Sequence, residues 1–352
     1  MRPGAQPGAQ PGAQAGLRIW FNRGYSLAPI AALMRVADPS LDVFISVSPH
    51  SALHPGPTAT WIDGGSAEAP ADDLDGYLDW VRSTIADNAI DLLIPTRHRS
   101  AIAAAGLPCR VHLPASAPTL ALLDDKFAFA QAMVGQNYHL PTSLISTSDD
   151  LAAVLACWPD DGTAVCVKPR HGVNGLGFWQ LADVAPTAHL QDPDRRRIQP
   201  DQYLAALRHQ ERRGPINDLV VMPYLPGPEI SFDVLADHGQ LLKYAARTKL
   251  ANGCQHIVSQ HPLEPSVATI VARFGLHGLV NAQFRRAVDD SWKLLEINSR
   301  PAGGVVYAEQ VGCRLVADWA GLLTGRLSAA SVDRSVVDTQ VSFATTVQRV
   351  VT

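Results

Sequence analysis

The pattern of expected strands changes near residue 115, and this change constrains the fold more than any other feature. Before it, short apolar segments typical of buried strands alternate with segments of helical spacing. The strands are expected at 17–21, 41–47 and 91–95, and the helices at 27–36 and 74–86. Because strands that alternate with helices form parallel sheets, we expect residues 17–115 to be an α/β domain built on a parallel sheet.

The second half of the chain has the pattern of antiparallel strand pairs joined by short turns. A helix is expected over residues 120–136, and the charged segment 192–214 is expected to be a solvent-exposed insertion with a helix. The second half is therefore predicted to be α+β, while the pattern after Gly325 places no element. The expected strands lie at 164–169, 219–223, 230–236, 240–248, 279–285 and 292–297.

Composition excludes several classes of protein. The net charge of −4 gives no basic excess for nucleic acid or for an anionic membrane surface. No apolar run is long enough to span a bilayer. The five cysteines form no CxxC pair, which favours a reducing, cytoplasmic setting over a disulfide or zinc scaffold. Residues 1–16 repeat PGAQ three times, and we expect them to be a disordered tail.

Three oxygen-bearing side chains are expected together on one sheet face. Side chains alternate along a strand, so Glu296 and Asn298 share a face, and Gln283 on the neighbouring strand can add a third oxygen. Hard oxygen donors suit Mg²⁺. Arg300 follows in a loop with Gly303 and Gly304, where a guanidinium could hold a phosphoryl group. The alternative is a polar face that is turned to solvent.

Two lysines are placed where an anion would explain them. Lys168 ends an apolar strand, which is unfavourable unless the ammonium meets a charge, and a glycine-rich loop follows it. This loop matches neither GxxxxGK[ST] nor GxGxxG, so neither a P-loop nor a dinucleotide fingerprint is present. Lys126 lies in a first helical turn after the candidate caps Asp124 and Asp125, against the helix dipole. Viewed alone, Lys126 would more often be an ordinary surface lysine.

The strand at 219–223 runs into a tight turn at 225–228, after which Glu229 opens the next strand. Such a hinge can offer backbone groups to an adenine edge, with Glu229 placed to accept from ribose hydroxyls. The alternative is a purely structural turn.

Taken in order and spacing, these elements resemble the ATP-grasp superfamily, which includes D-alanine–D-alanine ligase, biotin carboxylase and carbamoyl-phosphate synthetase. The resemblance covers residues 120–304, and the order of segments is also similar to that of ATP-grasp proteins from bacterial biosynthetic operons. It implies a Rossmann-like pre-ATP-grasp domain at 17–115 and an ATP-grasp domain at 116–326. The grasp domain would have a small lobe at about 116–222 and a large lobe at about 223–326. Residues 327–352 would be a segment of unknown role.

The resemblance also implies the roles of the site residues. Lys126 and Lys168 would bind phosphates, and Arg300 would contact the transferred phosphoryl group. The cofactors implied are ATP and Mg²⁺, or Mn²⁺ in its place. The remaining implied positions are the loop glycines Gly172, Gly175 and Gly177, the adenine hinge Val221, Met222 and Tyr224, the ribose contact Glu229, and the metal ligands Gln283, Glu296 and Asn298.

Two positions depart from the family pattern. Gln283 stands where many members carry an acid, which resembles the carbamoyl-phosphate synthetase variant and lowers the negative charge at the metals. Met222 and Pro223 stand where many members have an acidic residue in the hinge.

The activity implied is that of an ATP-dependent carboxylate–amine ligase that forms an acyl phosphate and then an amide. A kinase- or carboxylase-like enzyme and a non-catalytic nucleotide-binding regulator are the alternatives. The expected partners are a small carboxylate and an amine, with a homodimer as a possible assembly and neither nucleic acid nor membrane.

Candidate substrate contacts lie in both halves of the chain. Arg247 and Lys249 are two residues apart on a strand and share a face, which could bind a carboxylate or acyl phosphate if it faces the metals. In the first domain, ligands of parallel sheets gather at the carboxyl ends of strands. The residues there that could contact an anionic substrate are Asn22, Arg23, Arg97, His98 and Arg99.

Overall fold

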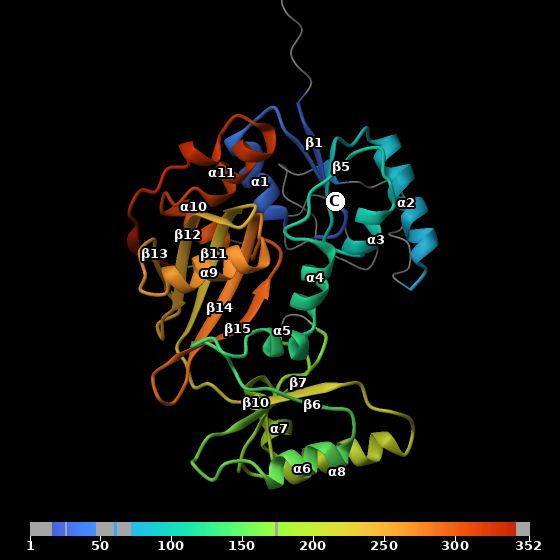
Figure 1. Cartoon of the computed structure of the whole chain (residues 1–352), viewed down its shortest axis with the longest axis vertical. Coiled ribbons are helices and arrows are strands. Elements are labelled where there is room, and N and C mark those ends of the chain that lie inside the picture. Colours follow the sequence, from blue (N-terminus) through green and yellow to red (C-terminus); the bar gives the residue numbers. More distant parts are fainter. Residues whose placement is uncertain (1–15, 25–26, 47–59, 62–71, 173–174, 343–352) are drawn as a thin grey trace, which may run out of the picture. The chain divides into compact units, whose positions relative to one another are not determined.

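The computed structural model describes residues 16–24, 27–46, 60–61, 72–172 and 175–342 (Figure 1). The tail predicted over residues 1–16 lies outside this set except for Gly16. The chain divides into two compact units, one of Met1–Leu113 with Val316–Ser328 and one of Pro114–Leu315 with Ala329–Thr352. No helix in the described part of the chain combines the length and apolarity that a bilayer crossing requires.

The first unit contains the predicted parallel sheet. Its strands lie in the order β3-β2-β1-β4-β5, and every neighbouring pair is parallel. The apolar residues of β1 are fully buried, as are Tyr77 and Val81 of helix α2. The strands are β1 (Arg18–Phe21), β2 (Asp42–Ile45), β3 (Thr60–Trp61), β4 (Leu92–Ile94) and β5 (Arg110–Val111). The helices are α1 (Ala28–Ala37), α2 (Leu74–Asp87), α3 (Arg99–Ala104) and most of α11 (Leu315–Thr324).

The helix expected over residues 120–136 is wrong as a single element, because the chain breaks at Asp125. Helix α4 (Ala117–Asp124) ends there and helix α5 (Lys126–Ala132) begins. Asp125 has an extended backbone, and its carboxylate accepts from the N–H groups of Phe127 and Ala128 at 3.0 and 3.1 Å. Apolar spacing continued through this position, but a capping carboxylate interrupts the helix and starts a second one.

The second unit holds two sheets, and the smaller carries the expected strands at 164–169 and 219–223. Its order is β6-β10-β7-β8-β9. Helices α6 and α8 lie side by side and cover it, with Leu151 buried against the strands and Leu204 packed on the same cluster (Figure 1). The strands are β6 (Ser143–Ile145), β7 (Val165–Pro169), β8 (Trp179–Leu181), β9 (Arg197–Ile198) and β10 (Leu219–Pro223). The helices are α6 (Ser148–Ala156), α7 (Ala188–Gln191) and α8 (Pro200–Glu211).

The larger sheet of the second unit is antiparallel throughout, in the order β15-β14-β11-β12-β13-β16. Both hairpins expected from the sequence are present, and the segment that the sequence left unplaced supplies the edge strand β16. The strands are β11 (Glu229–Asp237), β12 (Gln240–Lys249), β13 (Gln255–Val258), β14 (Gly278–Arg286), β15 (Trp292–Asn298) and β16 (Asp338–Val341). The helices are α9 (Glu264–Phe274) and α10 (Val305–Gln310).

Candidate active site

One cavity in the second unit is lined by twelve of the fifteen residues that the sequence singled out for the site. Its volume is about 580 Å³, within the range of small-molecule sites. Both sheets of the unit contribute to it. The twelve residues are Lys126, Lys168, Gly172, Gly175, Met222, Tyr224, Glu229, Arg247, Gln283, Glu296, Asn298 and Arg300.

The other three predicted residues are placed differently. Val221 is buried in the core between the smaller sheet and helices α6 and α8. Lys249 is the exposed last residue of β12 and is not part of the cavity lining, although it shares a strand face with Arg247. Gly177 also lies outside the lining, with a φ of 72° and the ring of Pro169 where a Cβ would be. Any larger residue at 177 would therefore displace the loop from β7.

Strand register explains why the polar residues of the larger sheet meet. Ser231 on β11 pairs with Arg247 on one side and Gln283 on the other, and Gln283 pairs with Glu296. These four side chains form a row across four strands on one face. A second row lies two residues away on the same face and contains Asp233, Asn281 and Asn298. The sequence did not single out Ser231, Asp233 or Asn281, because their pairing is set by strands that are distant in sequence.

The end of β15 is an oxygen-rich corner of the cavity. The side-chain amide of Asn298 donates to the Glu296 carboxylate at 2.9 Å, so the two side chains lie together on one face as the strand alternation predicts. Gln283 lies directly across from Glu296. A carboxylate with two side-chain amides is a donor set that fits Mg²⁺ and could hold it together with phosphate oxygens and water.

The two lysines share one electrostatic environment with this corner. The ammonium of Lys126 donates to the carbonyl of Gly172 at 2.7 Å. Burial lowers the pKa of Lys126 below 10.5, with Glu296 acting to raise it and the neighbouring Lys168 lowering it further. Six cationic and two acidic side chains line the cavity, so its lining suits a polyanion in a chain whose net charge is −4. The cations are Lys126, Lys168, Arg196, Arg247, Arg285 and Arg300, and the acids are Glu229 and Glu296.

Arg170 fixes the position of Lys126 and was missed from the sequence. Its guanidinium donates to both Asp125 oxygens, with the shortest contact at 2.6 Å, and to Asp218 at 3.0 Å. The carbonyl of Arg170 also accepts from the N–H of Lys126 at 3.1 Å. These hydrogen bonds hold the pKa of Asp125 below its usual value. The start of α5 is therefore tied to the end of β7, and the only local signal is an arginine two residues after Lys168.

A buried ion pair supports Arg247. Asp233 is 2% exposed and lies 3.6 Å from the Arg247 guanidinium. Burial raises the pKa of Asp233 to about 6, although the charge of Arg247 acts in the opposite direction. A Cβ on Gly304 would collide with the Arg247 guanidinium, so this glycine lets the loop after β15 close onto it.

The hinge after β10 is held by another residue that sequence reasoning missed. Arg285 donates to the carbonyls of Leu225 and Pro226 at 2.6 and 3.2 Å, and to Glu229 at 3.3 Å. The N–H of Tyr224 is already donated to Ala164 at 2.7 Å. An apolar cluster in the lining lies beside this hinge and includes Cys166, Phe178, Met222, Leu225 and Leu295.

Not all of the charged insertion at 192–214 faces solvent. Arg196 lies in the cavity lining, has a left-handed φ of 50°, and donates to the carbonyl of Gly175. It adds a cation to the glycine-rich loop, and its long sequence separation from that loop hid the contact.

The polar candidates of the first unit form a local network. Asn22 is fully buried, donates to Tyr77 and to the carbonyl of Arg97, and accepts from the N–H of Thr96 at 2.7 Å. The ring of His98 packs edge-on against Tyr77. Asn22 thus joins the carboxyl ends of β1 and β4.

Comparison with family models finds a match to part of the chain. Residues 215–347 match the family model described as ATP-grasp in the biosynthetic pathway with Ter operon. A search of curated protein sequences found no significant match.

Solved structures share the fold over most of the chain. The L-amino acid ligase from Bacillus licheniformis superposes with a TM-score of 0.61 and 15% identity, over 93% of this chain and 78% of the ligase. The N5-carboxyaminoimidazole synthetase from Staphylococcus aureus, complexed with ADP, gives a TM-score of 0.62 and 14% identity, over 93% of this chain and 81% of the synthetase. The biotin carboxylase domain of the 2-oxoglutarate carboxylase from Hydrogenobacter thermophilus was crystallised with MgADP and bicarbonate. It superposes with a TM-score of 0.61 and 14% identity, over 89% of this chain and 70% of that domain.

Proposed function

Because residues 215–347 match an ATP-grasp family model, we propose that the chain is an ATP-grasp enzyme that uses ATP to activate a small-molecule carboxylate and joins the acyl group to an amine. The first compact unit would be the domain that precedes the grasp, and the second would be the two-lobed grasp domain. One observation carries the proposal: the two predicted phosphate-binding lysines and the predicted metal ligands line a single cavity.

The lining residues fit a magnesium nucleotide. Lys126, Lys168 and Arg300 supply positive charge for the phosphates, and Glu296 with Asn298 supplies oxygen ligands for Mg²⁺. Bound Mg²⁺ would neutralise the charge that develops on the phosphoryl oxygens. Two similar structures were crystallised with ADP, one of them with its magnesium salt, which supports the same ligands here.

In the proposed reaction a carboxylate oxygen attacks the γ-phosphorus of ATP, the bond to the β-phosphate oxygen breaks, and ADP leaves. The amine nitrogen then attacks the acyl carbon, phosphate leaves, and the amine loses a proton. The lysines and Arg300 act by placement and by charge neutralisation, which dominate phosphoryl transfer. Arg247, which contacts buried Asp233 and lines the same cavity, would orient the substrate carboxylate.

ADP release tests this function directly. The full chain is incubated with MgATP and with pools of amino acids and small carboxylates, each with and without an amine, and products are identified by mass spectrometry. If the chain is a ligase, we expect ADP formation that depends on both the carboxylate and the amine, and a product with an amide bond. ATP binding without ADP release from any pool would contradict it and favour the nucleotide-binding regulator.

A carboxylase-like reaction is the second candidate, since two of the similar structures are a carboxyaminoimidazole synthetase and a biotin carboxylase domain. Bicarbonate would then replace the organic carboxylate. A parallel series with isotopically labelled bicarbonate separates the two reactions, because label retained in an acid-labile product identifies carboxylation. A stable phosphate ester in either series would identify a kinase.

A further inference from the structure

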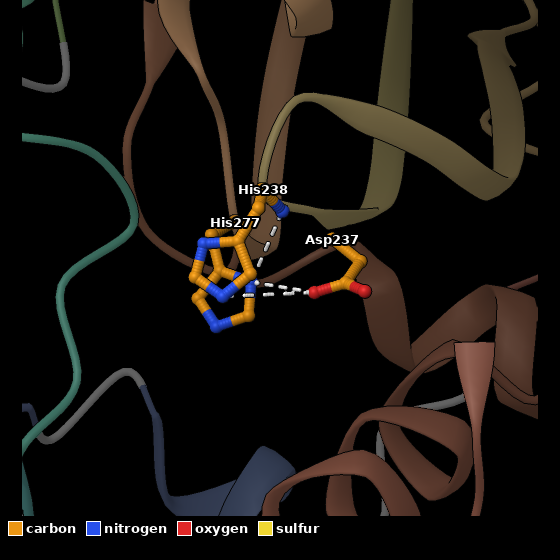
Figure 2. A group of neighbouring side chains, drawn as sticks. All are labelled: Asp237, His238 and His277. Carbon is orange, nitrogen blue, oxygen red and sulfur yellow. Dashed lines mark hydrogen bonds and ion pairs between the residues drawn. The ribbon is translucent and has the colours of Figure 1, made fainter.

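Three side chains of metal-ligating type gather outside the cavity, at the end of the β11–β12 hairpin (Figure 2). Asp237 ends β11, His238 follows it in the turn, and His277 lies between α9 and β14. One ligand atom from each residue lies within 4.8 Å of the ligand atoms of the others. The proposed ligase reaction uses none of the three.

The separations of these atoms are close to those around a bound ion. The Asp237 Oδ1 atom lies 3.3 Å from His277 Nδ1 and 3.8 Å from His238 Nε2. A tetrahedral zinc ion with bonds of about 2.0–2.1 Å holds its ligand atoms about 3.3–3.4 Å apart. The Asp237 Oδ1 and His277 Nδ1 atoms therefore already have the separation of two ligands of one ion, and the His238 ring must turn to supply the third.

The backbone holds the two histidines next to each other. His238 and Gly239 have φ values of 44° and 90°, a combination for which tight hairpin turns favour asparagine and glycine. The N–H of Gly239 donates to the carbonyl of Leu276 at 2.8 Å, which joins the turn to the loop that carries His277. Because the His238 side chain is 79% exposed, core packing does not account for an imidazole at this position.

One adjustment is needed for binding. Figure 2 shows that the two imidazole rings are stacked. Their centroids lie 3.9 Å apart and their planes make an angle of 12°. Stacked rings cannot both direct an in-plane lone pair at one ion, so His238 must turn its ring. Exposed side chains change rotamer within nanoseconds. The Nδ1 atom of His277 would exchange a long hydrogen bond from the His238 N–H, 3.4 Å, for the ion.

We propose that Asp237, His238 and His277 bind a first-row transition metal ion, with Zn²⁺ as the ion that fits best and water as its fourth ligand. Two imidazoles with one carboxylate form a mixed nitrogen–oxygen set that suits zinc and disfavours Mg²⁺. The ion would cross-link the β11–β12 turn to the loop before β14, at a site separate from the proposed nucleotide cavity.

Calorimetric titration of the full chain with ZnCl₂ tests this site. A large excess of MgCl₂ is present to occupy the oxygen-lined corner of the cavity, and no nucleotide is added, so the result is independent of the proposed reaction. The expected result is one zinc ion per chain. Affinity should fall at least about tenfold in Asp237→Asn, His238→Asn and His277→Gln.

His238→Asn is the sharpest variant, because asparagine suits the left-handed turn while the imidazole is lost. His209→Ala removes an exposed histidine of α8 and serves as the matched control, which should bind zinc as the wild type does. Circular dichroism checks that each variant is folded. If His277→Gln does not fold, the result for His238→Asn still decides the test. Absence of binding, or equal affinity in wild type and His238→Asn, would overturn the proposal and leave a hydrogen-bonded surface cluster only.

Discussion

Arg285 joins the turn after β10 to the first residue of β11. One guanidinium contacts two turn carbonyls and Glu229, the residue expected to meet the ribose. Its position near the end of the hairpin strand β14 gave no local sign of this role. The geometry of the adenine and ribose end of the cavity therefore depends on a side chain from a strand that lies some 60 residues further along the chain.

Replacing Arg285 with methionine should raise the KM for ATP roughly tenfold and leave kcat nearly unchanged, because binding is lost equally from the ground and transition states. Steady-state ADP formation measures both constants. Arg208→Ala, which removes an exposed arginine of α8, is the control. An unchanged KM in Arg285→Met would show that the turn is held without it.

Asp233 gives the pH dependence of stability a predictable sign. Burial raises its pKa from 3.8 to about 6, so between these values the folded protein binds a proton that the unfolded chain does not. The contribution of this residue to the free energy of unfolding must fall as pH rises from about 4 to about 6. The full shift corresponds to at most about 3 kcal/mol.

Urea unfolding of the wild type and of Asp233→Asn between pH 4 and pH 7 measures this contribution, because the variant cannot titrate at this position. The stability of the wild type relative to the variant should decrease as pH rises. Two curves that stay parallel across this range would contradict a raised pKa.

The break between α4 and α5 is the point at which the prediction of a single helix over residues 120–136 is wrong, and Lys126, which lines the cavity, lies directly after it. Apolar spacing alone extends one helix through the break, whereas the Asp125 carboxylate caps a new helix and also binds Arg170. The same residue thus sets the helix start and the position of Lys126. A capping role was foreseeable from the sequence, but the ion pair with a residue 45 positions away was not.

Two variants separate these roles of Asp125. Asp125→Ala removes the cap and the ion pair, and should lower the free energy of unfolding by about 1–2 kcal/mol and raise the KM for ATP. Asp125→Asn keeps a capping oxygen but loses the charge, so its stability should lie between those of Asp125→Ala and the wild type. Urea unfolding and ADP formation are the measurements. Equal stability of the two variants would mean that the cap contributes nothing.

The fold followed from local patterns wherever strands and helices were long and regular. The parallel sheet, both hairpins and the separate strands β7 and β10 were expected from apolar alternation and turn residues, whereas the pairing of β7 with β10 was not. Edge strands such as β9 and β16 were missed, because two to four partly exposed residues carry no clear pattern and are defined by their pairing.

The candidate site could be predicted only in part, because only some of its residues have a local sequence signal. Residues with a chemically unusual local setting, such as a lysine ending an apolar strand, were found. Residues that act through distant partners were not, and these are Arg170, Arg196, Asp233, Asn281 and Arg285. Their roles arise from strand register and from loops that meet across the cavity.

The second unit as a whole depends on one arrangement, in which cations of the smaller sheet and its preceding helix face oxygen donors of the larger sheet. Calorimetric titration of MgADP into the wild type, Lys168→Ala and Glu296→Ala, with Arg208→Ala as control, tests it most directly. We expect one nucleotide per wild-type chain and an affinity at least about tenfold weaker in Lys168→Ala and Glu296→Ala. Circular dichroism should show that both variants are folded. Wild-type affinity in either folded variant would contradict it.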